Sequence, residues 1–76
     1  MNARPLPGQV IRIYLKSRNG YFTDATVVES DASTLTIAQW RVYNGLEYRE
    51  PTRHVSVIPW QNIAKWEVLR EAGGDE

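Results

Sequence analysis

The sequence predicts an all-β domain in which a strongly bent antiparallel sheet of five strands closes into a small barrel. Three observations support this prediction: the chain has only 76 residues, apolar and polar residues alternate in several short segments, and turn-forming residues separate those segments. No stretch of about ten residues has the apolar spacing of a helix, so we expect no substantial helix, including at the N-terminus. Closure into a barrel leaves short strands without exposed edges.

The first hairpin is predicted from two alternating segments and the turn between them. Residues 9–16 place isoleucine and leucine side chains on one face and polar side chains on the other, which indicates a half-buried strand. Asn19-Gly20 follows, and this pair is typical of a hairpin turn. We expect the second strand over residues 21–30.

The remaining strands are predicted from three further turns. Asp31 begins a turn because its side chain can accept hydrogen bonds from the backbone just beyond it. Asn44-Gly45 marks a second hairpin, and Pro51 interrupts the returning strand because proline cannot donate to a ladder. Residues 59–62 are long enough only for a tight or 3₁₀ turn. The expected strands are 35–43, a fourth strand that Pro51 divides into 46–50 and 54–58, and 63–69.

The chain is expected to form one domain with short extensions. Residues 1–8 are predicted to be an extended arm, since Pro5 and Pro7 are unfavourable inside a helix. Residues 9–70 form the barrel, and residues 71–76 are a flexible acidic tail. A domain of this size buries only about 60% of the surface of its unfolded chain. We therefore expect stabilisation by a partner, and homo-oligomerisation is the simplest form.

The composition excludes several classes of protein. Nine basic and nine acidic residues give a net charge of zero, which argues against a polybasic protein that grips nucleic acid with its whole surface. There is no cysteine and one histidine, His54, so Cys-ligated and poly-histidine metal sites are ruled out. We expect no metal and no cofactor. The absence of a signal-like or membrane-spanning apolar run predicts a cytoplasmic protein.

No pattern of catalytic residues is found. The chain has no glycine-rich phosphate loop, no nucleophile elbow and no convergent pair of carboxylates. His54 has no second catalytic group beside it in the sequence. We therefore expect no enzymatic activity.

The charges are unevenly distributed, and this predicts a basic stripe. Residues 1–20 contain four basic residues and no acid. Alternation places Arg12, Tyr14 and Lys16 on the outward face of the first strand, with Arg18 beyond them. A basic stripe that contains an aromatic ring suits the backbone of a single-stranded nucleic acid with one base stacked. The alternative is a solvated face whose charges pair with acidic residues across the hairpin.

The later turn contains further candidate residues. Trp60 could stack a base, or it could pack against the core or a neighbouring subunit. Gln61 and Asn62 could hydrogen-bond a base edge, or they could cap the break between two strands. Both interpretations remain open.

The order of elements resembles the Sm-like fold, a small SH3-like barrel found in the Sm, LSm and Hfq proteins. The resemblance covers about residues 9–69. It depends on these segments: Ile11–Lys16, Asn19-Gly20, Ala25–Val27, Asp31 and Ile58–Ile63. It implies a homo-oligomeric ring of about five to eight subunits in which edge strands of neighbours continue one sheet. It also implies binding of RNA or single-stranded nucleic acid.

The chain departs from that family where RNA is bound. The loop after Asp31 contains Ser33 but neither a large amide nor an aromatic residue, and the turn at Trp60 lacks a Lys-His or Arg-Gly pair. The chain is thus similar to a divergent member. The predicted function is an Sm-like, ring-forming, nucleic-acid-binding protein. The alternative is a protein-interaction or scaffold module with the same small barrel. The candidate contacts are Arg12, Tyr14, Lys16, Arg18, Ser33, Trp60, Gln61 and Asn62.

Overall fold

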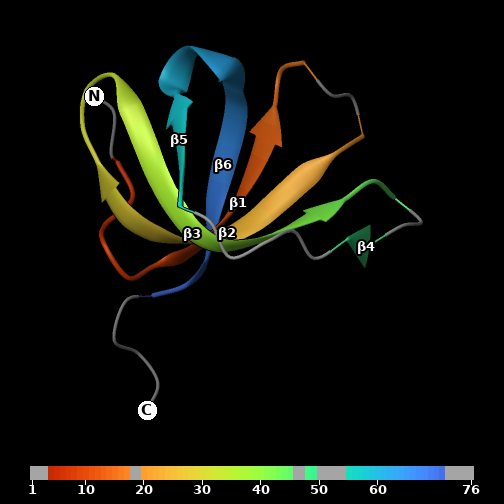
Figure 1. The fold of residues 1–76 in the computed structure, drawn as a ribbon, viewed down its shortest axis with the longest axis horizontal. Helices are drawn as coiled ribbons and strands as arrows, with labels where there is room; N and C mark the ends of the chain where they lie inside the picture. Colours follow the sequence, from red (N-terminus) through yellow and green to blue (C-terminus); the bar gives the residue numbers. More distant parts are fainter. Residues whose placement is uncertain (1–3, 18–19, 46–47, 50–54, 72–76) are drawn as a thin grey trace.

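A computed structural model of the chain describes residues 4–17, 20–45, 48–49 and 55–71. These residues form six strands and one 3₁₀ turn (Figure 1). The elements are β1 (Val10–Leu15), β2 (Phe22–Ser30), β3 (Thr34–Tyr43), β4 (Tyr48–Arg49), β5 (Ser56–Pro59), η1 (Trp60–Asn62) and β6 (Ile63–Arg70). The prediction of an all-β domain is confirmed, since the described ranges contain no α-helix.

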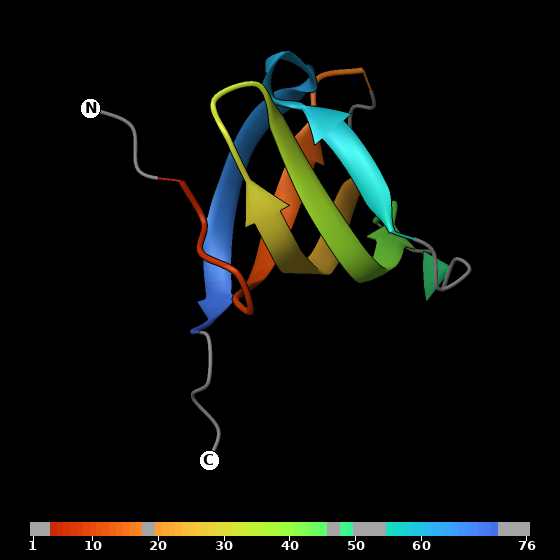
Figure 2. The same ribbon diagram turned by 60° about the vertical axis from the view of Figure 1, so that its left-hand side comes forward.

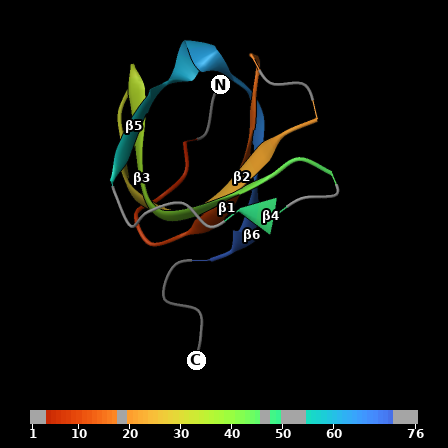
Figure 3. The same ribbon diagram turned by 45° about the vertical axis from the view of Figure 1, so that its right-hand side comes forward.

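The strands form one antiparallel sheet with the order β4-β3-β2-β1-β6, and β5 also pairs with β3. The sheet curls, and β5 and β6 diverge from η1 toward different sides of the molecule (Figures 2 and 3). Among the described residues, β5 pairs only with β3, and β6 pairs only with β1. No ladder therefore joins β5 to β6 in these ranges, and closure of the barrel stays a prediction.

The core lies inside this curl and is built from short aliphatic side chains. Alternate residues of β1 and of the first halves of β2 and β3 point inward, as the period of two requires. The buried apolar residues are Ile11, Ile13, Ala25, Val27, Leu35, Ile37 and Ile63. All three tryptophans lie at the margin of this cluster, where they are only partly buried.

A β-bulge bends β3 where it crosses β2. Thr26 pairs with Ala38 and Asp24 with Arg41, so Ala25 faces two residues of β3 instead of one. One of these, Gln39, has a φ of 52°, the left-handed conformation that a bulge of this kind requires. The bend lets the first half of β3 pair with β5 and its end pair with β4.

Three further irregularities explain apolar side chains that lie outside the core. Val28 is the extra residue between the pairs of β2 with β3, and Ala64 and Leu69 are extra residues between the pairs of β6 with β1. All three side chains are exposed. Ala64 therefore does not share the face of Trp66 and Val68, because the bulge at that residue interrupts the alternation.

Residues 4–9, the described residues before β1, contain neither helix nor strand but are tied to β2. The Gly8 N–H donates to the Val27 carbonyl at 2.8 Å, and the Val27 N–H donates to the Gln9 carbonyl at 2.8 Å. Pro5 is fully buried, and its carbonyl accepts a hydrogen bond from Ser30 at 3.1 Å. The expected tail, residues 71–76, lies outside the described residues except for Glu71.

A membrane-spanning helix would need a long apolar segment. None of the described residues forms one.

Candidate nucleic-acid interface

The outer face of the sheet carries two continuous rows of side chains that cross four strands. The register pairs Tyr14 with Lys65 on one side and Phe22 on the other, and Phe22 in turn with Tyr43. These residues form the aromatic row: Lys65, Tyr14, Phe22 and Tyr43. The neighbouring register positions form the charged row: Glu67, Arg12, Asp24 and Arg41. Both rows run β6-β1-β2-β3.

Within the aromatic row, the rings contact one another and the cations beside them. Phe22 stacks on Tyr43 with ring centroids 4.8 Å apart and lies 5.7 Å from Tyr14 in a tilted arrangement. The Lys65 ammonium lies 4.6 Å from the centroid of Tyr14, and the Arg12 guanidinium lies 4.3 Å from that of Phe22. Ring faces on which a nucleotide base would have to stack are thus in contact with side chains of the same chain.

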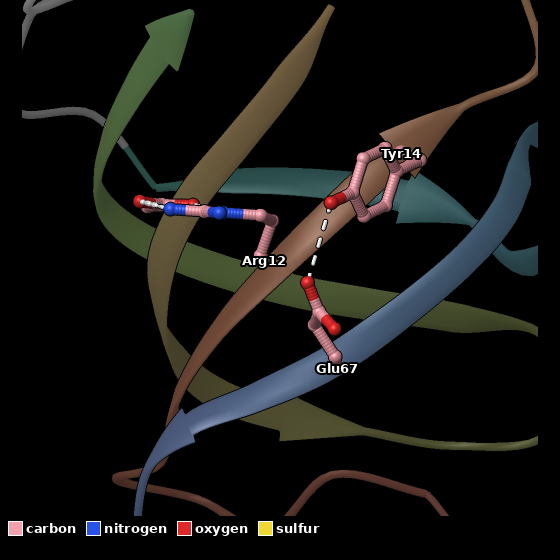
Figure 4. A network of polar contacts seen from close by, with 4 residues as sticks. Arg12, Tyr14 and Glu67 are labelled. Carbon is pink, nitrogen blue, oxygen red and sulfur yellow. Dashed lines mark hydrogen bonds and ion pairs between the residues drawn. The ribbon is translucent and has the colours of Figure 1, made fainter.

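Within the charged row, Arg12 and Asp24 form a two-point ion pair. Arg12 Nε donates to Asp24 Oδ1 at 2.8 Å, and its Nη2 donates to Oδ2 at 3.1 Å. The hydrogen bonds to Asp24 are the main reason that the pKa of Arg12 is raised above its usual value. Tyr14 donates to Glu67 Oε2 at 3.2 Å (Figure 4). Arg12 is thus held by a carboxylate of its own sheet, as the alternative interpretation of the stripe requires.

The second group of candidate residues lies at the end of the sheet where η1 joins β5 to β6. Asp31 shapes the turn between β2 and β3: its Oδ1 accepts the N–H groups of Ser33 and Thr34, each at 2.8 Å. These backbone hydrogen bonds, that of Thr34 first, lower the pKa of Asp31. The Asp31 carboxylate is therefore part of the turn structure, because its negative charge strengthens the hydrogen bonds from these two backbone N–H groups.

Trp60 joins η1 to that turn. Its indole Nε1 donates to the Asp31 carbonyl at 2.8 Å, and its backbone N–H donates to the Ser33 carbonyl at 3.0 Å. The ring also packs against the core and lies 6.2 Å from the ring of Trp66. Trp60 therefore fixes the geometry of this end of the sheet, and packing is its observed role.

The polar side chains around Trp60 are exposed. Gln61 and Asn62 project from η1, and Ser33 projects from the neighbouring turn. Lys16 reaches the same end, because its backbone N–H donates to the Asn62 carbonyl at 2.9 Å. We call Lys16, Ser33, Gln61 and Asn62 the rim. It offers one cation, two amides and a hydroxyl, which are groups that contact phosphates and base edges.

The structure thus divides the eight predicted contact residues. Ser33, Gln61, Asn62 and Lys16 come together at the rim, on a base formed by Trp60. Arg12 and Tyr14 lie on the outer face, where each has a partner within the chain. Arg18 lies outside the described residues.

Sequence reasoning did not single out four members of the rows, namely Phe22, Arg41, Lys65 and Glu67. The signal that could have found them is the pairing register. A two-residue turn at Asn19-Gly20 would place Arg18 opposite Tyr21, whereas the observed pairs end at Tyr14 and Phe22. The loop is longer than the pair of turn residues indicates.

The fold and the rim define a small all-β domain with a polar end, in which β5 and β6 each have one edge that is unpaired among the described residues. No protein-family model matches the chain, and no curated protein or solved structure matches it either. The likeness to Sm-like proteins therefore depends on the residues given above.

Proposed function

We propose that the chain is an Sm-like subunit that assembles into a homo-oligomeric ring through strands β5 and β6 and binds single-stranded nucleic acid at the rim. The observation that supports assembly is the presence of two strand edges that are unpaired in the described residues. A strand edge is a template for pairing with another chain. Pairing β5 of one subunit with β6 of the next is a head-to-tail contact, and repeated contacts of this kind close into a ring.

The side chains at the β5 edge favour pairing over solvation. Residues 55–59 contain no charge, and Val55 and Val57 are 60% and 61% exposed. Natural proteins usually protect a solvated edge with lysine or another charged residue. On β6, Trp66 is only partly buried and Val68 is 38% exposed, although both face the same side as the core residues of β1. A neighbouring strand would cover these apolar groups.

The rim supports nucleic-acid binding through local rather than overall charge. Lys16 is exposed beside the amides of η1 and can contact a phosphate, while Gln61 and Asn62 can hydrogen-bond base edges. One cation per subunit gives weak binding. A ring repeats the contact in every subunit, and this multiplicity raises the overall affinity.

Assembly is tested by sedimentation velocity and native mass spectrometry of the full chain. Val57→Lys is expected to dissociate the edge contact, because a charged side chain on an edge strand opposes strand addition. Val57→Thr keeps the branched shape and should retain the assembly. A wild-type chain that is monomeric at micromolar concentration would overturn the proposed ring.

Nucleic-acid binding is tested by fluorescence anisotropy with labelled oligo(U) and oligo(A). Lys16→Glu should weaken binding about tenfold or more and reduce the dependence of the affinity on salt, since each phosphate contact contributes to that slope. Arg70→Glu is the matched control, because Arg70 lies at the other end of β6 from η1. Equal losses in the two variants, or no binding by the wild type at low salt, would contradict a rim site.

A protein-interaction module with the same fold is the second candidate. The ion pair between Arg12 and Asp24 favours it, because it removes a predicted phosphate contact. Salt distinguishes the two functions: nucleic-acid binding weakens steeply as salt rises, whereas binding through apolar side chains does not.

A further inference from the structure

We propose that the outer face of the sheet binds the same face of a second copy of this chain, around a twofold axis that passes between Arg12 and Asp24. This surface is separate from the edges of β5 and β6 and from the rim. The inference goes beyond the proposed function and does not depend on it.

The first argument is the order of charges along the charged row. From β6 to β3 the signs are negative, positive, negative and positive, at Glu67, Arg12, Asp24 and Arg41. A twofold axis at the centre of the row reverses this order in the second copy. Glu67 then faces Arg41 of the second copy, and Arg12 faces its Asp24. Every position meets the opposite sign, which is the self-complementarity that a twofold interface requires.

The second argument is the aromatic row beside the charged row. An axis that reverses the charged row lies parallel to the strands, between β1 and β2, so each row meets the same row of the second copy. Tyr14 then faces Phe22 of the second copy, because these two residues are register partners on β1 and β2. Both rings are partly exposed in the single chain, and aromatic side chains are enriched at protein interfaces.

The third argument concerns the alternative occupant. The charged row has equal numbers of positive and negative side chains, so it offers no net attraction to a phosphate backbone. The rings of the aromatic row contact one another and neighbouring cations, so they do not offer free faces for bases. A protein surface with the reverse charge order fits better, and the chain itself supplies one.

The two kinds of contact are compatible. Edge contacts between β5 and β6 are head-to-tail, whereas the face contact is twofold. A ring of head-to-tail contacts joined to a second ring by twofold contacts is a closed, dihedral assembly. If the edges do not pair, the face contact alone gives a dimer. In both cases, loss of the face contact halves the mass of the assembly.

The test is a charge exchange between the exposed ends of the charged row, read by sedimentation velocity and native mass spectrometry at low salt. Glu67→Arg places two arginines opposite each other, and Arg41→Glu places two glutamates opposite each other. Each variant alone should therefore have half the wild-type mass, with association weakened at least about tenfold. An equimolar mixture of the two variants should regain the wild-type mass, because each unlike pair is restored. Glu29→Arg, which adds the same charge at an exposed position of β2 outside the row, should have no effect.

The double variant Glu67→Arg/Arg41→Glu should also assemble as the wild type does. The inference is overturned if the single variants keep the wild-type mass, or if they lose it and neither the mixture nor the double variant restores it. Failure of the proposed ring gives a different result. Val57→Lys then leaves the mass of the assembly unchanged, while each single charge variant still halves that mass and the mixture of the two still restores it. Circular dichroism of each variant checks that the fold is intact.

Discussion

The indole nitrogen of Trp60 donates a 2.8 Å hydrogen bond to the backbone carbonyl of Asp31, which lies 29 residues earlier in the chain. This bond joins η1 to the turn between β2 and β3. It thereby connects the two edges of the curled sheet to the rim, since η1 begins where β5 ends and ends where β6 begins. The geometry of the rim and the divergence of β5 and β6 consequently depend on the same contact.

Trp60→Phe tests this contact. Phenylalanine keeps an aromatic ring on the core but leaves the Asp31 carbonyl without its indole donor, so the free energy of unfolding should fall by about 1 kcal/mol. Urea denaturation followed by circular dichroism measures the change. Oligonucleotide binding should weaken as well, because η1 also carries Gln61 and Asn62. A variant as stable as the wild type would show that ring packing alone holds η1.

The turn at Asp31 should make stability depend on pH. Hydrogen bonds from Thr34 and Ser33 lower the pKa of the folded carboxyl, so this group stabilises the fold above its unfolded pKa, which is about 3.9. The contribution is lost as the pH falls through the lower, folded pKa. Thermal melts of the wild type and Asp31→Asn should therefore differ at pH 7 and converge on acidification. If the two melting temperatures differ by the same amount at every pH, the stability of the turn depends on the shape of the Asp31 side chain and not on its charge.

Gln9 is a buried polar residue that ties the two ends of the described chain together. Its Oε1 accepts the Leu6 N–H at 2.8 Å, and its Nε2 donates to Glu71 at 2.7 Å. Methionine is similar in size to glutamine, but Gln9→Met removes both hydrogen bonds and leaves the Leu6 N–H without its acceptor. We expect a loss of about 1–3 kcal/mol in chemical denaturation. Glu71→Gln, which preserves an acceptor for Nε2, is the control and should cost less.

Gln39 is in the left-handed conformation at the bulge of β3. Glycine adopts this conformation without strain, which offsets its larger loss of chain entropy. Gln39→Gly should therefore leave stability unchanged or raise it by up to about 1 kcal/mol, whereas the β-branched Gln39→Val should lower it by about 1–2 kcal/mol. Thermal melts measure both variants. Equal stability of the two would mean that the bulge relaxes when its residue is changed.

The strands and the turn at η1 could be predicted from the sequence because they depend on local patterns: alternation of apolar residues, turn residues and a proline. The rows on the outer face could not, because they depend on register. Each bulge shifts the pairing by one residue, and nothing local in the sequence marks Gln39, Val28 or Ala64 as the extra residue. Three of the rim residues, Ser33, Gln61 and Asn62, could be named as candidates because they adjoin recognisable turns, whereas the place of Phe22 and Tyr43 in the aromatic row depends on the pairing of β2 with β3.

The ion pair of Arg12 explains why a stripe that looks basic in the sequence need not bind phosphate. Arg12 makes two hydrogen bonds to Asp24 and lies over Phe22. Lysine keeps the charge but cannot form both hydrogen bonds and stack on the ring. Arg12→Lys should therefore lower the free energy of unfolding by about 0.5–1 kcal/mol and leave oligonucleotide affinity unchanged. Lys16→Arg, a conservative change at the rim, should change neither the free energy of unfolding nor the oligonucleotide affinity. Affinity that falls in Arg12→Lys without a loss of stability would return Arg12 to the nucleic-acid interface.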